Sequence, residues 1–185
     1  RRRTNAGWPW SLPASGISGT EMRRFWITAI ATFAIDQLTK LAVVQGLDLF
    51  HRGEIDVLPP YLTFRMAWNQ GVNFGLLSHG SDLVRWGLVA VSLAISAWVI
   101  WWMRRERGNW KAELAGGLLV GGALGNIIDR IAYGAVADFL NMSCCGIENP
   151  YAFNVADIAI FAGALGLVIF AGGQAKGGKP VRRRR

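Results

Sequence analysis

Two aspartates, Asp138 and Asp157, lie where long apolar stretches meet polar loops. A carboxylate at such a position is costly to desolvate, so it usually marks a functional site. If the two face each other, one can take a proton from water while the other donates a proton to the carbonyl of a peptide bond. The sequence therefore predicts acid–base hydrolysis, and two separate interfacial carboxylates are the alternative.

The residue three positions before Asp157 supports a helix that starts there. Asn154 is a good N-cap residue and would place Asp157 in the first helical turn. Asp138 has no cation adjacent in sequence. If the two carboxyl groups share one proton, they titrate as a unit.

Four apolar segments must position these carboxylates. The chain has 185 residues, of which 52% are hydrophobic, and its nearly uncharged windows are residues 25–44, 83–103, 114–128 and 153–173. A membrane-spanning helix needs about 20 residues, a length that all but the third window reach. A soluble bundle would show a polar stripe on each helix, and residues 83–103 have almost none. We predict an all-α integral membrane protein with four transmembrane helices.

The positive charge predicts the orientation of these spans. The formal net charge is +8, and most lysines and arginines precede the first span, separate the second from the third, or follow the fourth. Cytoplasmic segments carry such an excess, so both termini should be cytoplasmic. Topology and anionic lipid explain the basic balance, and no nucleic-acid partner is needed.

The chain ends lie outside the predicted membrane domain. Residues 1–24 should form a disordered cytoplasmic extension, with Met22 as a candidate natural start, and residues 174–185 a basic cytoplasmic tail. The first span resembles a signal peptide in its basic start, but Asp36 and Lys40 interrupt it, so we expect it to be retained. Residues 25–173 then form one four-span catalytic domain.

The segment between the first two spans contains a predicted strand. Apolar Leu62, Phe64, Met66 and Trp68 alternate with other residues, and this period of two is typical of a half-buried strand. On the outer side of a membrane, the strand could form a small β platform that presents the substrate. A plain edge strand covering the bundle is the alternative.

The third span carries glycines and charges at helical spacing. Gly117, Gly121 and Gly125 form one stripe, which predicts close helix packing in lipid. Asp129 can neutralise the neighbouring Arg130 or another cation nearby, and Asp36 and Lys40 form an i, i+4 pair in the first span. We interpret these charges as structural.

Five motifs in this order resemble bacterial lipoprotein signal peptidase, the signal peptidase II type of intramembrane aspartic peptidase. They are DQLTK (residues 36–40), NQGVNFG (69–75), GGALGNIIDR (121–130), VADF (136–139) and FNVAD (153–157). The resemblance covers residues 25–172. It implies cleavage of diacylglyceryl-modified prolipoproteins on the N-terminal side of the lipidated cysteine, with two aspartates and no metal or cofactor. It also implies inhibition by the cyclic peptide globomycin, and we expect a monomer in the bacterial inner membrane with its site near the periplasmic interface.

The resemblance also assigns roles to individual residues. Asp138 and Asp157 match the catalytic pair, and Asp129 is a rival for the first role that we rank second because Arg130 lies beside it. Asp36 and Lys40 match structural support. The family positions around the substrate or inhibitor are matched by Asn69, Gly71, Asn126, Arg130 and Asn154.

Some features fall outside this pattern. Asn73 stands where the family often has a small residue. Cys144 and Cys145 could form a vicinal disulfide, but we favour free or partly buried thiols without a catalytic part. His51 and His79 are isolated, so they build no metal site. The alternative functions are a small proton-coupled transporter and a membrane scaffold with ion-paired aspartates.

Overall fold

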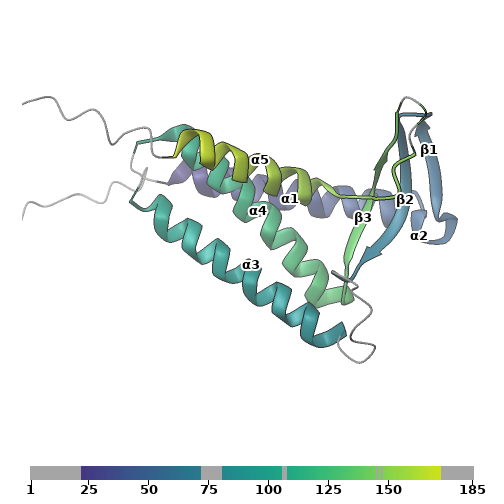
Figure 1. Ribbon diagram of the computed structural model, residues 1–185, viewed down its shortest axis with the longest axis horizontal. Coiled ribbons are helices and arrows are strands. Elements are labelled where there is room, and N and C mark those ends of the chain that lie inside the picture. Colours follow the sequence, from purple (N-terminus) through teal and green to yellow (C-terminus); the bar gives the residue numbers. More distant parts are fainter. Residues whose placement is uncertain (1–21, 72–80, 106–107, 145, 147, 172–185) are drawn as a thin grey trace, which may run out of the picture.

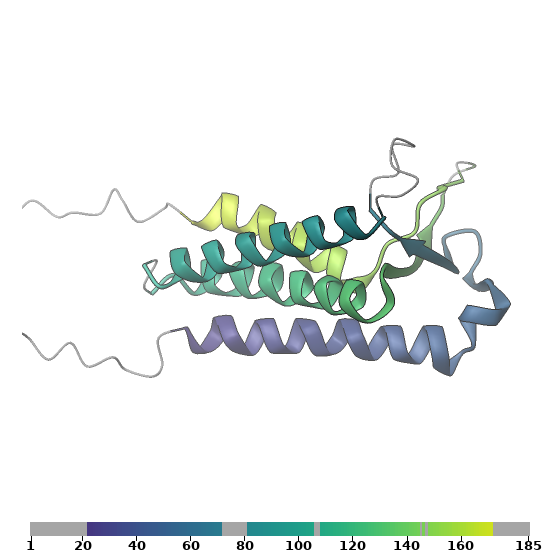
Figure 2. The same ribbon diagram turned by 90° about the horizontal axis from the view of Figure 1, so that it is seen from below.

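The computed structural model describes residues 22–71, 81–105, 108–144, 146 and 148–171. Residues 1–21 of the predicted extension, the predicted tail, His79 and Asn73 lie outside these residues, whereas Arg23 and Arg24, which we assigned to the extension, are the first residues of a helix. Four long helices form a bundle, and a three-stranded sheet lies at one end of it (Figures 1 and 2). The first and last described residues lie at the other end.

The first helix, α1 (Arg23–Lys40), continues through a π-helical segment (Leu41–Gly46) and is followed by the short α2 (Leu49–Arg52). The helices α3 (Ser81–Met103) and α4 (Trp110–Tyr133) come next, and α5 (Val155–Phe170) is the last. The helix α4 packs against α1, α3 and α5, so it is the centre of the bundle.

Within the described part of the chain, three helices are long and apolar enough to cross a membrane, namely Arg23–Gly46, Asp82–Met103 and Trp110–Tyr133. The helix α4 is thus longer than the third predicted window (residues 114–128), because it includes the polar end as far as Tyr133. The fourth is shorter, with 16 residues. It begins after Phe153, which pairs with Leu140 at the sheet instead of joining the helix.

The glycine stripe brings the helices of the bundle together as predicted. A Cβ atom on Gly117 would lie 2.6 Å from the backbone oxygen of Phe25 in α1, and one on Gly125 would lie 2.5 Å from Oδ2 of Asp36. On the other side of α4, a Cβ atom on Gly122 would lie 2.5 Å from the backbone oxygen of Ala156 in α5. These contacts explain why α4 needs glycine on both faces.

The sheet is antiparallel, with the order β1 (Glu54–Leu58), β2 (Leu62–Asn69) and β3 (Val136–Met142). The predicted strand is confirmed as β2, and its Phe64 and Met66 pack against a small core with Phe139. We predicted that the platform comes only from the segment between the first two spans, and the structure differs from this prediction. Its third strand follows α4 and carries Asp138, because residues 136–142 pair with β2.

Candidate active site

Asp138 lies on β3, outside the membrane helices, and only 2% of its surface is exposed. Two asparagine side chains hold its carboxylate: Nδ2 of Asn154 donates to Oδ1 at 2.6 Å, and Nδ2 of Asn69 donates to Oδ2 at 3.0 Å. Asn69 reaches it because β2 pairs Ala67 with Asp138, two residues before Asn69. Gly71 fixes Asn69 in turn, since its N–H donates to Oδ1 of Asn69 at 2.9 Å.

Asp157 lies in the first turn of α5, as the N-cap pattern predicted. Its backbone N–H donates to Oδ1 of Asn154 at 2.9 Å, and the N–H of Asn154 donates back to Oδ2 of Asp157 at 3.2 Å. This is a capping box, which fixes the carboxylate against the helix N-terminus. The other carboxylate oxygen accepts from Nδ2 of Asn126 in α4 at 2.8 Å.

Asn154 connects the two carboxylates. It is fully buried, and its Nδ2 donates to Asp138 and also to Oδ1 of Asn126 at 3.2 Å. Asn126 in turn donates to Asp157, so the amide of Asn154 bonds directly to Asp138 and is connected to the carboxylate of Asp157 through Asn126. The structure therefore brings together Asn69, Asp138, Asn154, Asn126 and Asp157 in one chain of hydrogen bonds.

The environment of Asp138 favours its protonated form. Burial, and after it the negative charge of Asp157, raise the pKa of Asp138 to about 6, although the hydrogen bonds from Asn69 and Asn154 and the charge of Lys40 oppose this. At pH 7, a carboxyl with a pKa of about 6 keeps its proton in roughly a tenth of the molecules, against about one in a thousand for an ordinary aspartate. Asp138 is therefore suited to donate a proton near neutral pH.

A second group of charges lies beside this pair, and we call Asp36, Lys40 and Asp129 the ion cluster. Nζ of Lys40 lies 2.7 Å from Oδ2 of Asp36 and 2.7 Å from Oδ2 of Asp129. All three side chains are buried. Gln37 also spans the cluster, because its Nε2 donates to both aspartates at 3.1 Å.

The surroundings of Asp129 and Asp138 differ. The carboxylate of Asp129 accepts from Gln37, Lys40 and the backbone N–H of Ala137, and it is 1% exposed. It is thus paired with a cation and occupied by donors, whereas the donors to Asp138 among the described residues are the amides of Asn69 and Asn154. This geometry fits a structural Asp129. Of the two predicted partners of Asp129, Arg130 or another cation nearby, the structure shows the second, namely Lys40.

Arg130 lies half-buried near the carboxylate pair, and its charge acts on both Asp157 and Asp138. Its Nη1 donates to the backbone oxygen of Asn126 at 3.3 Å. The buried Nε has no hydrogen-bond partner in the described part of the protein. The guanidinium therefore has donors left for a ligand.

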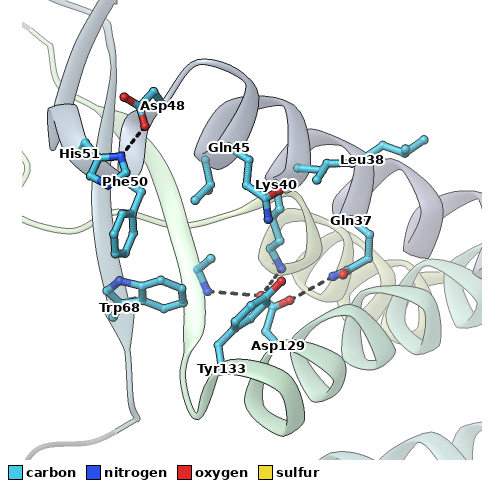
Figure 3. Close-up of a pocket in the computed structure, with 13 residues that line it drawn as sticks. Gln37, Leu38, Lys40, Gln45, Asp48, Phe50, His51, Trp68, Asp129 and Tyr133 are labelled. Atoms are coloured by element: carbon cyan, nitrogen blue, oxygen red, sulfur yellow. Dashed lines mark hydrogen bonds and ion pairs between the residues drawn. The ribbon is translucent and has the colours of Figure 1, made fainter.

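A cavity of about 650 Å³, here called the rear cavity, opens on the far side of the ion cluster. Figure 3 shows Lys40 and Gln37 directed at Asp129, with Trp68, Tyr133 and Phe50 around them. Neither Asp138 nor Asp157 lines this space, although Ala137, which precedes Asp138, does. Its wall also includes membrane-helix residues such as Leu38. The rear cavity thus reaches the ion cluster that lies beside the carboxylate pair and not the pair itself.

The structure gives Gln37 a part that its sequence motif does not reveal. Gln37 belongs to the DQLTK motif, but its spacing alone does not show that it bridges two aspartates in different helices.

Cys144 is disulfide-bonded, so our preference for a free thiol was wrong. His51 pairs with Asp48. Among the described residues, no group of three His, Cys, Asp or Glu side chains is placed to hold a metal ion.

Two hydrogen-bonded carboxylates at the end of an apolar helical bundle define a membrane protein with the equipment of an aspartic hydrolase. The comparisons with known proteins agree. The profile of the family described as signal peptidase (SPase) II matches residues 28–171, and the chain belongs to this family of peptidases. The resemblance read from the five motifs is thereby confirmed.

Relatives cover most of the chain. A lipoprotein signal peptidase of Methylorubrum extorquens (strain PA1) is 47% identical over 150 residues, which is 81% of this chain and 86% of the relative. The corresponding protein of Alteromonas mediterranea is 36% identical over 151 residues, which is 81% and 80%. A bacterial membrane enzyme solved at 2.3 Å has a TM-score of 0.67 with 25% identity and covers 86% of this chain and 94% of its own.

Proposed function

We propose that this peptidase removes the signal peptide from diacylglyceryl-modified prolipoproteins by cleaving on the N-terminal side of the lipidated cysteine. The observation that carries the proposal is the hydrogen-bonded connection of Asp138 and Asp157 through Asn154 and Asn126. This connection supports a mechanism in which the two carboxylates act on one peptide bond. The family membership and the lipoprotein signal peptidases among the relatives supply the substrate class.

The two aspartates divide the chemistry. Asp157 at the N-terminus of α5 is the ionised partner, because a helix N-terminus stabilises negative charge, and it takes a proton from the attacking water. Asp138, whose pKa of about 6 favours a retained proton, donates that proton to the scissile carbonyl oxygen. The hydroxide oxygen forms the new bond to the carbonyl carbon. When the C–N bond breaks, the proton on Asp157 moves to the leaving amine, and the gem-diol proton returns to Asp138.

The remaining site residues hold the reacting groups. Asn69, Asn126 and Asn154 orient the carboxylates, and Gly71 orients Asn69. Arg130 donates from its unused N–H groups to a backbone carbonyl of the substrate. In this proposal, the ion cluster supports the site and does not touch the substrate.

The membrane placement completes the proposal. Residues 25–173 form a catalytic domain with four spans, between a cytoplasmic extension (residues 1–24) and a basic cytoplasmic tail (residues 174–185). In Figure 1, the end of the bundle opposite the sheet carries the first and last described residues and the turn between α3 and α4. That turn includes Arg104 and Arg105, and α1 begins with Arg23 and Arg24, which supports a cytoplasmic position for this end.

The sheet then lies at the periplasmic interface. With 16 residues, α5 is about 24 Å long at 1.5 Å per residue, shorter than a hydrocarbon core of about 30 Å. Its N-terminus with Asp157 therefore lies just below the outer interface, where a lipidated substrate can arrive through the bilayer. The protein acts as a monomer without a cofactor, and globomycin-type cyclic peptides block it.

Cleavage of a diacylglyceryl prolipoprotein by purified protein tests the function. Asp138→Asn and Asp157→Asn should each reduce kcat by about 10³-fold, as expected for a catalytic acid or base. Asp56→Asn, which removes a carboxylate from strand β1 away from the site, is the matched control and should retain normal cleavage. Normal turnover by folded Asp138→Asn would end the assignment, and an inert wild type would refute the function itself.

A further inference from the structure

Two backbone N–H groups connect the ion cluster to the carboxylate pair. Oδ1 of Asp36 accepts from the N–H of Ala156 at 2.9 Å, and Oδ2 of Asp129 accepts from the N–H of Ala137 at 3.2 Å. Each of these N–H groups belongs to the residue that directly precedes a catalytic aspartate. One member of the cluster therefore holds the backbone next to Asp157, and the other holds the backbone beside Asp138.

Lys40 joins these two anchors. Its ammonium lies 2.7 Å from both carboxylates, and it comes from α1, whereas Asp157 begins α5 and Asp138 lies on β3. Hydrogen bonds to charged groups are the stronger ones, so a charged anchor fixes a peptide group more firmly than a neutral one. A single cation thus links both halves of the site.

We propose that Lys40 is a positioning residue that sets the separation of Asp138 and Asp157 by holding Asp36 and Asp129 together. The inference rests on the proposed two-aspartate mechanism. Without the ammonium, two buried carboxylates would face each other uncompensated and move apart or take up a proton. Because each accepts an N–H next to a catalytic aspartate, their displacement moves both reacting groups.

The fit of Asp36 against α4 shows how little room this arrangement has. A Cβ atom at Gly125 would lie 2.5 Å from Oδ2 of Asp36, the oxygen that contacts Lys40. The substitution Gly125→Ala therefore displaces the anchor of Asp157 without removing any charge. Gly117→Ala is its matched control, since the added Cβ meets Phe25 on the same pair of helices, far from the cluster.

The rear cavity allows a direct test. Lys40 lines this cavity of about 650 Å³, so Lys40→Ala leaves space that a small amine can enter. A misplacement of about 1 Å in an active site can cost about 10²-fold in rate, so kcat should fall by about 10²-fold with KM within threefold. Ethylammonium should restore kcat at least tenfold in the folded variant and leave the wild type unchanged. Tetramethylammonium has no N–H donor and should restore nothing.

A double-variant cycle keeps the inference testable if Lys40→Ala does not fold. If Lys40 couples the two anchors, Asp36→Asn combined with Asp129→Asn should lower kcat about as much as the more severe single variant. Gly125→Ala should lower kcat at least tenfold, and Gly117→Ala should lower only thermal stability. These outcomes would support a positioning role.

Three results would overturn it: folded Lys40→Ala with kcat within threefold of the wild type, a tenfold loss that ethylammonium does not reverse, or single-variant losses that multiply in the double variant. The failure of the proposed function is distinct. In that case the wild type itself does not cleave, or Asp138→Asn and Asp157→Asn retain activity. If the aspartate variants are inactive while Lys40→Ala is unimpaired, only the inference fails.

Discussion

Replacing Asn154 by alanine removes the amide that connects the two carboxylates of the proposed catalytic pair. The variant loses the 2.6 Å donation to Asp138, the 3.2 Å donation to Asn126 and the cap on the N–H of Asp157. Loss of an N-cap costs about 1 kcal/mol, and loss of a hydrogen bond to a charged group costs about 1.5–3 kcal/mol. The hydrogen bond to Asn126, between neutral groups, adds about 0.5–1.5 kcal/mol, so we expect a loss of roughly 3–5.5 kcal/mol in the free energy of unfolding.

The effect on activity should exceed what this destabilisation explains. At a temperature where the variant stays folded, kcat for prolipoprotein cleavage should fall by about 10²-fold, because both carboxylates lose their common anchor. Asn109→Ala is the matched control. Asn109 caps α4 by accepting from Ala112, and its amide donates to the backbone oxygen of Phe170 at 2.7 Å.

The two variants thus remove similar local bonds at opposite ends of the bundle. Asn109→Ala should destabilise the protein in chemical or thermal unfolding but leave kcat within twofold. If Asn154→Ala also retains kcat within threefold of the wild type, the amide does not orient the carboxylates. The hydrogen-bonded chain would then be a structural feature only.

Three further predictions follow from the site. Activity that depends on the protonated form of Asp138 should fall as the pH rises through about 6. The variant Asn69→Ala should move this fall to higher pH, because the hydrogen bond from Asn69 lowers the pKa of Asp138. A pH–kcat profile that Asn69→Ala leaves unshifted contradicts this role. Gly71→Ala should lower kcat, since Gly71 has a φ of +96° and a Cβ there would lie 2.6 Å from Cδ1 of Leu88, and a cleavage assay with wild-type kinetics would exclude the turn as a support. Reducing the disulfide of Cys144 should leave kcat within twofold, because the chain of hydrogen bonds around Asp138 and Asp157 contains no sulfur. A large loss of kcat on adding a reductant would show that the segment after β3 shapes the site.

The local patterns of the sequence predicted the elements of this site well. The alternation from Leu62 to Trp68 predicted β2, the glycine stripe predicted the close packing of α4, and Asn154 predicted the start of α5. Each of these signals depends on neighbours within a few residues. For the same reason, the pairing of Asp36 with Lys40 could be expected from an i, i+4 spacing.

The long-range partners could not be predicted in this way. Asp129 has Arg130 beside it in sequence but pairs with Lys40 from another helix, because α4 directs its buried face toward α1. The short run around Asp138 has too few residues to show a period, and it becomes a strand only because β2 offers it an edge. Tertiary pairing decides such cases, since a weak local preference is easily overridden.

The distribution of cations explains why only one of the two carboxylate pairs is suited to proton transfer. Asp36 and Asp129 share the ammonium of Lys40 at 2.7 Å and accept backbone N–H groups, so their charge is compensated where it is buried. Asp138 and Asp157 receive mainly neutral amide donors, with no ion pair to either among the described residues. Burial and the negative charge of Asp157 therefore raise the pKa of Asp138 to about 6, since no cation contacts Asp138 directly in the described part of the protein. If Lys40 were instead next to Asp138, that aspartate would remain ionised and lose its value as a proton donor. The placement of one lysine thus separates a fixed, charged support from a titratable pair.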